Sequence, residues 1–249
     1  MPAQTDHPSF PQPLSKNTKI WRYMDFTKFV SLISSNSLFF NRSDLFEDTF
    51  EGSFPKRNPI LRQRNLEDYM SDNDAQRSAE TSGDIVRAFK QWTYINCWHA
   101  NEHESAAMWK LYSKINESIA IESTYADLKN VLQDDIYLGL VKYIDYDTEL
   151  IPEGNIFNTF MYKRKSFEHE KEVRALLQRP PSAYGEIQPY RENEKYGVNI
   201  DINLNQLIKK IYVAPDAPNW LLELTEEISR KYNITADVQK SNLNEEPIF

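Results

Sequence analysis

Two carboxylates and a guanidinium, Glu170, Glu172 and Arg174, stand at alternate positions in one short stretch of the chain. If residues 170–177 form a strand, alternate side chains share a face, and these three groups point the same way. Two acids held beside a cation can orient a substrate hydroxyl or stabilise a developing positive charge. A solvated strand face without activity has the same pattern, so both interpretations stay open.

A guanidinium near the start of the chain is the second candidate group. Arg22 falls within an expected strand at residues 20–23, and its planar fork suits bidentate contacts to a phosphate. The alternative is a structural salt bridge to one of the acids in the loop at residues 41–52. Trp98, at the end of an expected strand at residues 94–98, could stack on an aromatic ring of a ligand.

Other reactive residue types have simpler interpretations. His99 and His103 flank Glu102, but the spacing suits zinc only on a helix, and a turn is expected here. Cys97 lies in an apolar strand and is expected to be an inert buried thiol. Trp109 is more typical of a core residue than of a ligand pocket, although it stays in the candidate set.

Composition excludes several classes of protein. The 249 residues are 40% hydrophobic and carry 37 acids against 29 bases, which disfavours broad attraction to nucleic acid or to an anionic membrane. Six glycines give no nucleotide-binding glycine-rich loop, and a single cysteine fits a reducing compartment. No signal peptide or membrane-spanning run is found, so we expect a cytoplasmic protein.

The elements that must position these groups predict an α+β fold. About eight short strands are separated by helices without strict alternation, which indicates one domain at residues 16–240 with a mixed or antiparallel sheet. Residues 1–15 are expected to be a flexible lead-in, 55–90 a helical insertion or lid, and 241–249 a tail. Asp25 should cap a helix that ends at Asn36, and residues 156–166 are expected to be helical.

The order of motifs resembles a known bacterial family. The motifs are Trp21-Arg22-Tyr23, Phe46-Glu47-Asp48 with Glu51-Gly52, Cys97-Trp98 with Glu102, Met108 to Tyr112, Phe167 to Arg174, and Ile211 to Pro215. Together they resemble the family catalogued as domain of unknown function 2971, over about residues 19–238. This resemblance implies no established activity.

A weaker similarity suggests a mechanism. An Arg on a first strand and a later Glu-x-Glu-Val entry to a strand are similar to the arginine–serine–glutamate ADP-ribosyltransferases. The resemblance implies that Arg22 holds the dinucleotide, that Glu172 stabilises the oxocarbenium-like transition state at the nicotinamide ribose, and that Glu170 orients the acceptor. The family's middle Ser-Thr-Ser motif is replaced here by residues 96–99, Asn-Cys-Trp-His.

The sequence therefore predicts NAD-dependent ADP-ribosyl transfer or NAD cleavage, with a protein or nucleic acid as acceptor, as in a toxin or phage-defence effector. The expected catalytic residues are Glu172 and Glu170, the expected NAD contacts are Arg22, Tyr23, Trp98 and Arg174, and the expected pocket residues are Asp48, Glu51, Glu102, Trp109 and Lys163. No metal ligand is expected. Two alternatives stay open: a magnesium-dependent nuclease built on Asp44, Asp48, Glu51 and the glutamate pair with Lys163 or Lys171, and a non-catalytic binding module.

Overall fold

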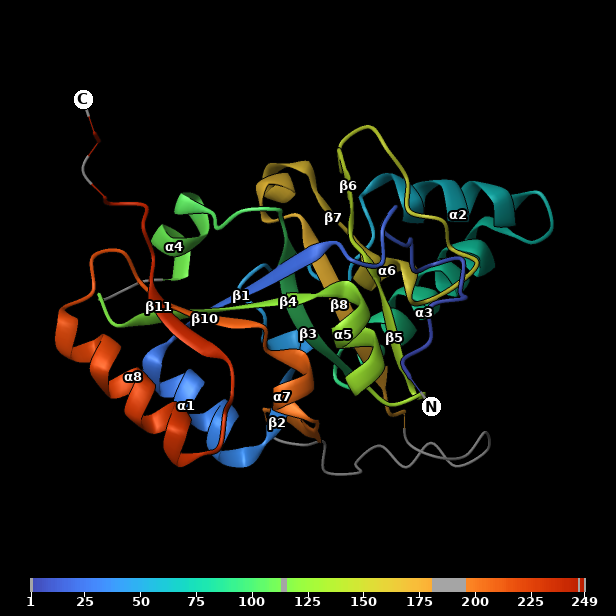
Figure 1. Ribbon diagram of the computed structural model, residues 1–249. Helices are drawn as coiled ribbons and strands as arrows, with labels where there is room; N and C mark the ends of the chain where they lie inside the picture. Colours follow the sequence, from blue (N-terminus) through green and yellow to red (C-terminus); the bar gives the residue numbers. More distant parts are fainter. Residues whose placement is uncertain (1, 113–115, 181–195, 246, 249) are drawn as a thin grey trace.

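A nine-stranded mixed sheet with helices packed against it forms the body of the protein (Figure 1). The computed structural model describes residues 2–112, 116–180, 196–245 and 247–248. The strand order is β11-β10-β4-β1-β3-β2-β9, with β8 also paired to β3 and β5 paired to β8. Every pair in this sheet is antiparallel except β10 with β11. The predicted α+β class with a mixed sheet is confirmed.

The strands of the described residues are β1 (Lys19–Asp25), β2 (Ser37–Arg42), β3 (Thr93–Ala100), β4 (Ser118–Thr124), β5 (Ile136–Leu140), β6 (Lys142–Ile144), β7 (Tyr162–Arg164), β8 (Glu172–Gln178), β9 (Gly197–Asp201), β10 (Lys210–Val213) and β11 (Asp237–Lys240). The α-helices are α1 (Phe26–Ser35), α2 (Arg57–Glu67), α3 (Asp72–Lys90), α4 (Ala106–Tyr112), α5 (Tyr125–Val131), α6 (Asn158–Met161), α7 (Leu204–Leu207) and α8 (Asn219–Lys231), and the 3-10 helices are η1 (Ser43–Leu45) and η2 (Lys165–Glu170).

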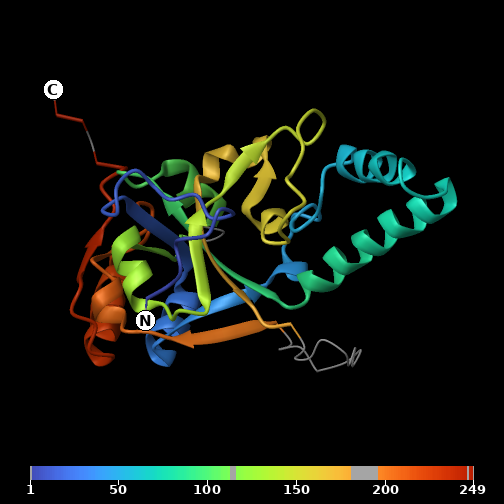
Figure 2. The same ribbon diagram turned by 90° about the vertical axis from the view of Figure 1, so that its right-hand side faces the viewer.

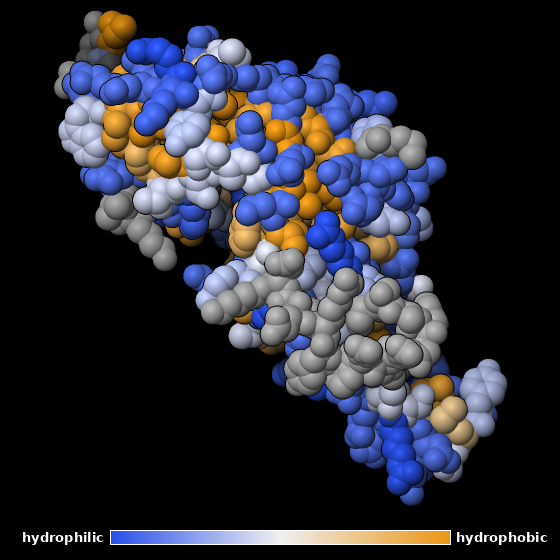
Figure 3. All heavy atoms as spheres, turned by 90° about the horizontal axis from the view of Figure 1, so that it is seen from below, coloured by the Kyte–Doolittle hydropathy of each residue, from blue (hydrophilic) through white to orange (hydrophobic). Residues whose placement is uncertain are grey.

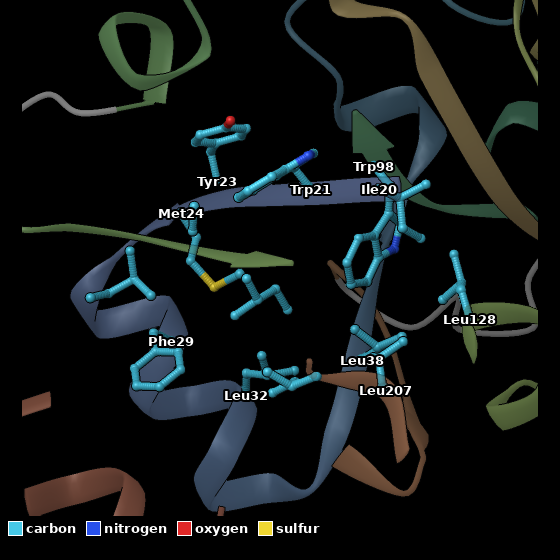
Figure 4. Close-up of a cluster of buried hydrophobic side chains, with 14 of the residues drawn as sticks. Ile20, Trp21, Tyr23, Met24, Phe29, Leu32, Leu38, Trp98, Leu128 and Leu207 are labelled. Atoms are coloured by element: carbon cyan, nitrogen blue, oxygen red, sulfur yellow. The ribbon is translucent and has the colours of Figure 1, made fainter. Parts of the chain in front are cut away.

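Local signals define the first helix as the sequence predicted. The Asp25 side chain accepts a hydrogen bond of 2.7 Å from the backbone N–H of Lys28 and caps the start of α1. Asn36 ends the helix in the left-handed conformation, with φ of 52°. Strand β1 then alternates, so that Met24 points toward α1 while Trp21 and Tyr23 point to the other face (Figure 4).

The main core fills the space between the sheet and the helices α1, α5, α7 and α8. Helices α1 and α8 cover one face (Figure 1), where Phe29, Ile33 and Leu221 are buried. Trp98 is the largest side chain with less than 2% exposure, and it belongs to this core. Burial on this scale is the dominant contribution to the stability of such a domain.

A smaller apolar cluster lies on the opposite face of the sheet. Its buried members are Phe10, Ile95, Phe160, Met161 and Leu176. The N-terminal segment was expected to be a flexible lead-in, but it packs here, because Phe10 brings a large ring that is buried against Tyr137 and Phe157. A Cβ at Gly139 of β5 would lie 2.7 Å from the Phe10 Cβ, so the two segments are in close contact.

The expected helical insertion is a hairpin of α2 and α3 that projects from the body (Figure 2). Ser71 caps α3, and Arg62 forms an ion pair of 2.7 Å with Glu153 that ties α2 to the loop before α6. The molecule is elongated, and its broader part shows an apolar area bordered by polar side chains (Figure 3). None of the helices within the described ranges is both long and apolar enough to cross a lipid bilayer.

Two local expectations are wrong. Residues 156–166 do not form one helix, because they divide into α6, the strand β7 and the start of η2. Strand β8 begins at Glu172 rather than at residue 170, since Lys171 adopts the left-handed conformation with φ of 40° and separates η2 from the strand. Glu170 therefore does not alternate with Glu172 along a strand. Strand β7 pairs in parallel with β6 as a separate two-stranded sheet.

Candidate functional site

The sheet opens on one side of β3. On its β8 side, β3 pairs continuously from Thr93 to His99. On the other side, it pairs with β2 only at residues 94–95 and with β1 only at residues 99–100. Among the described residues, Asn96 to Trp98 thus have a partner strand on the β8 side alone. A cavity of about 610 Å³ lies where β1 and β2 diverge, within the range of small-molecule sites.

Arg22 lines this cavity, and none of the described acidic residues forms an ion pair with it. Its guanidinium carbon is 5.9 Å from the centroid of the Trp98 ring, and both residues line the cavity. No described residue forms a hydrogen bond or an ion pair with Arg22. Burial lowers the pKa of Arg22 to about 10, so the guanidinium stays charged at neutral pH. A half-buried cation without a partner is suited to an anionic ligand.

The acids that could have neutralised Arg22 have other partners. Asp44 forms an ion pair of 2.7 Å with Arg42, and Asp48 forms one of 2.7 Å with Arg164. The sequence also allowed a structural salt bridge between Arg22 and an acid of the loop at residues 41–52. For Asp44 and Asp48 this alternative is wrong, because each is paired with another arginine. Asp48 still lines the cavity, as the sequence predicted.

Glu172 occupies a buried position at the start of β8 and also lines the cavity. Its Oε1 lies 2.6 Å from Lys163 Nζ and its Oε2 lies 2.6 Å from Arg174 Nε. The Tyr143 hydroxyl accepts a hydrogen bond of 2.8 Å from the Glu172 backbone N–H. Burial alone would raise the pKa of Glu172, but the charge of Arg174 and the contacts with Glu170 and Lys163 hold it well below its usual value. Glu172 is a fixed carboxylate and not part of a solvated face.

Arg174 is a buried guanidinium that links Glu172 to Glu51. It is 1% exposed, both Nη atoms donate to the Glu51 carboxylate, and Nη1 also donates to the Phe160 carbonyl oxygen at 2.6 Å. All three of its nitrogens therefore have protein acceptors. The sequence assigned Arg174 to NAD binding, but its place in the fold is that of a positioning residue for Glu172, with Glu51 as its counter-ion.

Glu170, the last residue of η2, contacts the same lysine as Glu172. Lys171, in its left-handed conformation, turns the chain between η2 and β8, and Lys163 Nζ donates to the Glu170 carboxylate as well as to Glu172. Burial and the hydrogen bond and negative charge of Glu172 raise the pKa of Glu170 to about 7. Glu170 therefore exchanges a proton near neutral pH, while Glu172 remains ionised.

The structure gathers most of the remaining candidates and separates two. Tyr23, Trp98, Glu51 and Lys163 line the cavity together with Arg22 and the glutamate pair. Glu102 does not, because it follows β3 and borders a second hollow with Lys19 and Lys240. Trp109 is 3% exposed and donates to Glu104 at 3.0 Å. It packs edge-on against Tyr23, so it supports a side chain that lines the cavity.

His99 is a cavity residue that the sequence treated only as a metal candidate. Its Nδ1 donates to the Glu170 carbonyl oxygen at 2.6 Å, and burial lowers its pKa, so the ring is neutral with a lone pair on Nε2. Within the described part of the chain, Nε2 has no hydrogen-bond partner. Its position on the same strand as Trp98 was the available signal, but strand register alone decides that it lies opposite Glu172.

The carboxylates of the described part of the site are paired with arginine and lysine side chains. Within the ranges that the structure describes, no three His, Cys, Asp or Glu side chains are grouped so that they could hold a metal ion. Asp44, Asp48 and Glu51 each face an arginine instead. The donor set that a magnesium-dependent nuclease needs is thus committed to ion pairs.

Comparisons of the chain with protein-family models, with curated proteins and with solved structures find no match. Both resemblances stay predictions, and the chemistry of the cavity is the basis for any function.

Proposed function

We propose that this protein is an enzyme that cleaves the bond between nicotinamide and ribose in NAD, passing ADP-ribose to an acceptor or to water. The observation that carries the proposal is that Arg22, a cation without an ion-pair partner among the described residues, borders the same cavity as Glu172 and Glu170. We infer that Arg22 faces the pyrophosphate of NAD and that Glu172 faces its nicotinamide ribose.

Arg22 supplies the contact to the pyrophosphate. A guanidinium that has left bulk water gains more from a phosphate than an exposed one, because the local dielectric is lower. Trp98 borders the same cavity, but the residue is 2% exposed and its ring lies against Arg22, so it supports the guanidinium. Arg22 thus supplies the anion binding that the pyrophosphate of a dinucleotide needs.

Glu172 supplies the negative charge at the ribose. When the glycosidic bond breaks, nicotinamide leaves as a neutral molecule with the bonding electron pair, and positive charge develops on the ribose. A carboxylate that Lys163 and Arg174 hold in place stabilises this charge without reorganisation. The acceptor oxygen or nitrogen then bonds to the ribose carbon and loses a proton, which Glu170 can take up because its pKa is about 7.

The experiment that tests the proposal is incubation of the purified full chain with NAD, with and without cell lysate. The readouts are free nicotinamide and transfer of labelled ADP-ribose to protein or nucleic acid. We expect nicotinamide release by the wild type, and loss of release in Arg22→Ala and Glu172→Gln. The matched control is Arg87→Gln on α3, which removes a 79% exposed guanidinium away from the cavity. Absence of release under both conditions would reject the proposal and favour the non-catalytic binding module.

A further inference from the structure

The small sheet of β6 and β7 delivers two side chains to the start of β8. Tyr143 of β6 and Lys163 of β7 are register partners in this sheet. The Tyr143 hydroxyl accepts from the Glu172 backbone N–H, and Lys163 donates to the Glu172 carboxylate. One residue of each strand therefore contacts Glu172, which fixes both its backbone and its side chain.

Lys163 is saturated by contacts within the protein. Its ammonium lies 2.6 Å from Glu172 Oε1, donates to the Glu170 carboxylate and lies 4.6 Å from the centroid of the Phe167 ring. An ammonium has three donors, so two carboxylates and one aromatic face account for them all. The residue is 8% exposed. Lys163 lines the cavity, as the sequence predicted, and these contacts direct its ammonium toward the glutamates.

The charges of this network do not balance when every acid is ionised. Three carboxylates, from Glu51, Glu170 and Glu172, face two cations, Arg174 and Lys163. An uncompensated negative charge in a buried network is unfavourable, so the arrangement favours one added proton. Glu51 has the fork of Arg174, and Glu172 has both cations. Glu170 has only a share of Lys163, and it is therefore the carboxylate that takes the proton.

The other titratable groups near Glu170 do not change this assignment. Tyr112 of α4 and Tyr143 of β6 face it, and burial raises the pKa of both hydroxyls, so they stay neutral. His99 of β3 is neutral and donates to the Glu170 backbone. Among the described residues, Lys163 is the one cation that forms an ion pair with Glu170.

We propose that Lys163 is a positioning residue that holds two neighbouring glutamates in different protonation states, Glu172 as a permanent carboxylate and Glu170 as a carboxyl group that exchanges its proton. Its part in catalysis rests on the proposed function, in which Glu172 faces the ribose and Glu170 receives the proton of the acceptor. The charge arrangement itself does not depend on NAD and can be tested without it.

The experiment is a carbon-13 NMR titration of the glutamate carboxyl carbons in the full chain from about pH 4 to about pH 10. Glu170→Gln assigns the signal of Glu170. We expect Lys163→Met to raise the midpoint of Glu170 by about 1 unit or more, because loss of a cation in contact has effects of this size. Lys163→Arg keeps the charge and should restore the midpoint, and Tyr143→Phe, which removes a contact to Glu172 without changing charge, is the control.

An unchanged Glu170 midpoint in folded Lys163→Met would overturn the proposal. If circular dichroism shows that Lys163→Met does not fold, Glu172→Gln tests the same network. The Glu170 midpoint should fall in this variant, since the neighbouring negative charge is gone. A constant Glu170 midpoint in Glu172→Gln would also overturn the proposal. Nicotinamide release is measured on the same proteins. Its absence in the wild type would reject the proposed function alone, whereas its pH profile should move with the NMR midpoint in Lys163→Met.

Discussion

Trp21 and Glu172 lie opposite the same residue, His99, on the two sides of β3. Adjacent strands are about 4.8 Å apart, so the backbones at Trp21 and Glu172 are about 10 Å apart although the residues are distant in the sequence. Arg22 follows Trp21 at the point where β1 diverges from β3. In this register Glu172 shares the sheet face of Trp21, whereas Arg22 alternates to the face of Met24. Both residues nevertheless border one cavity, because β1 and β2 diverge beside β3 and leave the sheet open there.

Replacement of Arg22 by Ala should weaken NAD binding without destabilising the fold. Loss of charge-assisted hydrogen bonds to a phosphate corresponds to about a 10-fold to 100-fold loss of affinity. Because Arg22 has no hydrogen-bond or ion-pair partner among the described residues and only its contact with the Trp98 ring is lost, we expect the free energy of unfolding to change by less than about 1 kcal/mol. Isothermal titration calorimetry and urea denaturation measure the two effects. Equal affinity, or a large loss of stability, would show that Arg22 has a structural role instead.

Replacement of Glu172 by Gln should affect both turnover and stability. We expect at least about a 100-fold fall in kcat, since the fixed charge at the ribose is removed. The structure adds a cost of about 3 kcal/mol in the free energy of unfolding, because Lys163 and Arg174 lose a buried counter-ion. Single-turnover nicotinamide release and urea denaturation distinguish the two losses, and a stable but inactive variant would contradict the second.

The raised pKa of Glu170 predicts a pH dependence with a definite sign. The folded protein keeps the proton up to a pKa of about 7, whereas the unfolded chain loses it near the ordinary value. The contribution of Glu170 to stability is therefore fully present below the unfolded pKa and is lost as the pH rises through about 7. Glu172, with its lowered pKa, contributes in the opposite sense and only at lower pH.

Glu170→Gln should remove this decline in stability between the unfolded and folded pKa values. Denaturant unfolding of the wild type and the variant at a series of pH values is the measurement. A decline of the same size in both proteins would assign the effect to another group. Nicotinamide release by the wild type should rise as Glu170 loses its proton, with half of the maximal rate near pH 7.

The left-handed conformation of Lys171 should tolerate Gly and reject Val. Lys171→Gly removes the Cβ that disfavours a φ of 40°, so we expect stability to change little or to increase by up to about 1 kcal/mol. Lys171→Val should cost about 1 to 3 kcal/mol, because a β-branched residue is strained there. Thermal unfolding of both variants is the check. Nicotinamide release should fall in the Val variant, since Glu170 would no longer reach Lys163.

The N-terminal segment should contribute to stability through Phe10. This ring is 2% exposed and packs in the smaller apolar cluster. Phe10→Ala should therefore cost about 3 to 5 kcal/mol. Leu14→Ala is the matched control, because Leu14 is fully exposed and the change should stay within about 0.5 kcal/mol. Equal denaturation midpoints for the two variants would show that Phe10 does not contribute to the stability of the fold.

The sequence by itself determined the local elements. The helix from its cap at Asp25 to its end at Asn36 and the apolar strand at residues 94–98 follow from contacts between near neighbours. The same signals were sufficient for the α+β class, because the mixture and the order of strands and helices restrict how layers can pack. Spacing also indicated that Glu172 and Arg174 share a face.

Only the tertiary structure decided what these side chains do. Alternation cannot show whether a face is solvated or buried, and burial of Glu172 and Arg174 depends on Glu51 and Lys163, which come from other parts of the chain. Likewise, Arg22 has no ion-pair partner among the described residues because Asp44 and Asp48 are paired with other arginines. The physical reason is that the charge and pKa of a buried group are set by whatever lies within a few ångströms in space, and strand register brings those neighbours together from distant positions.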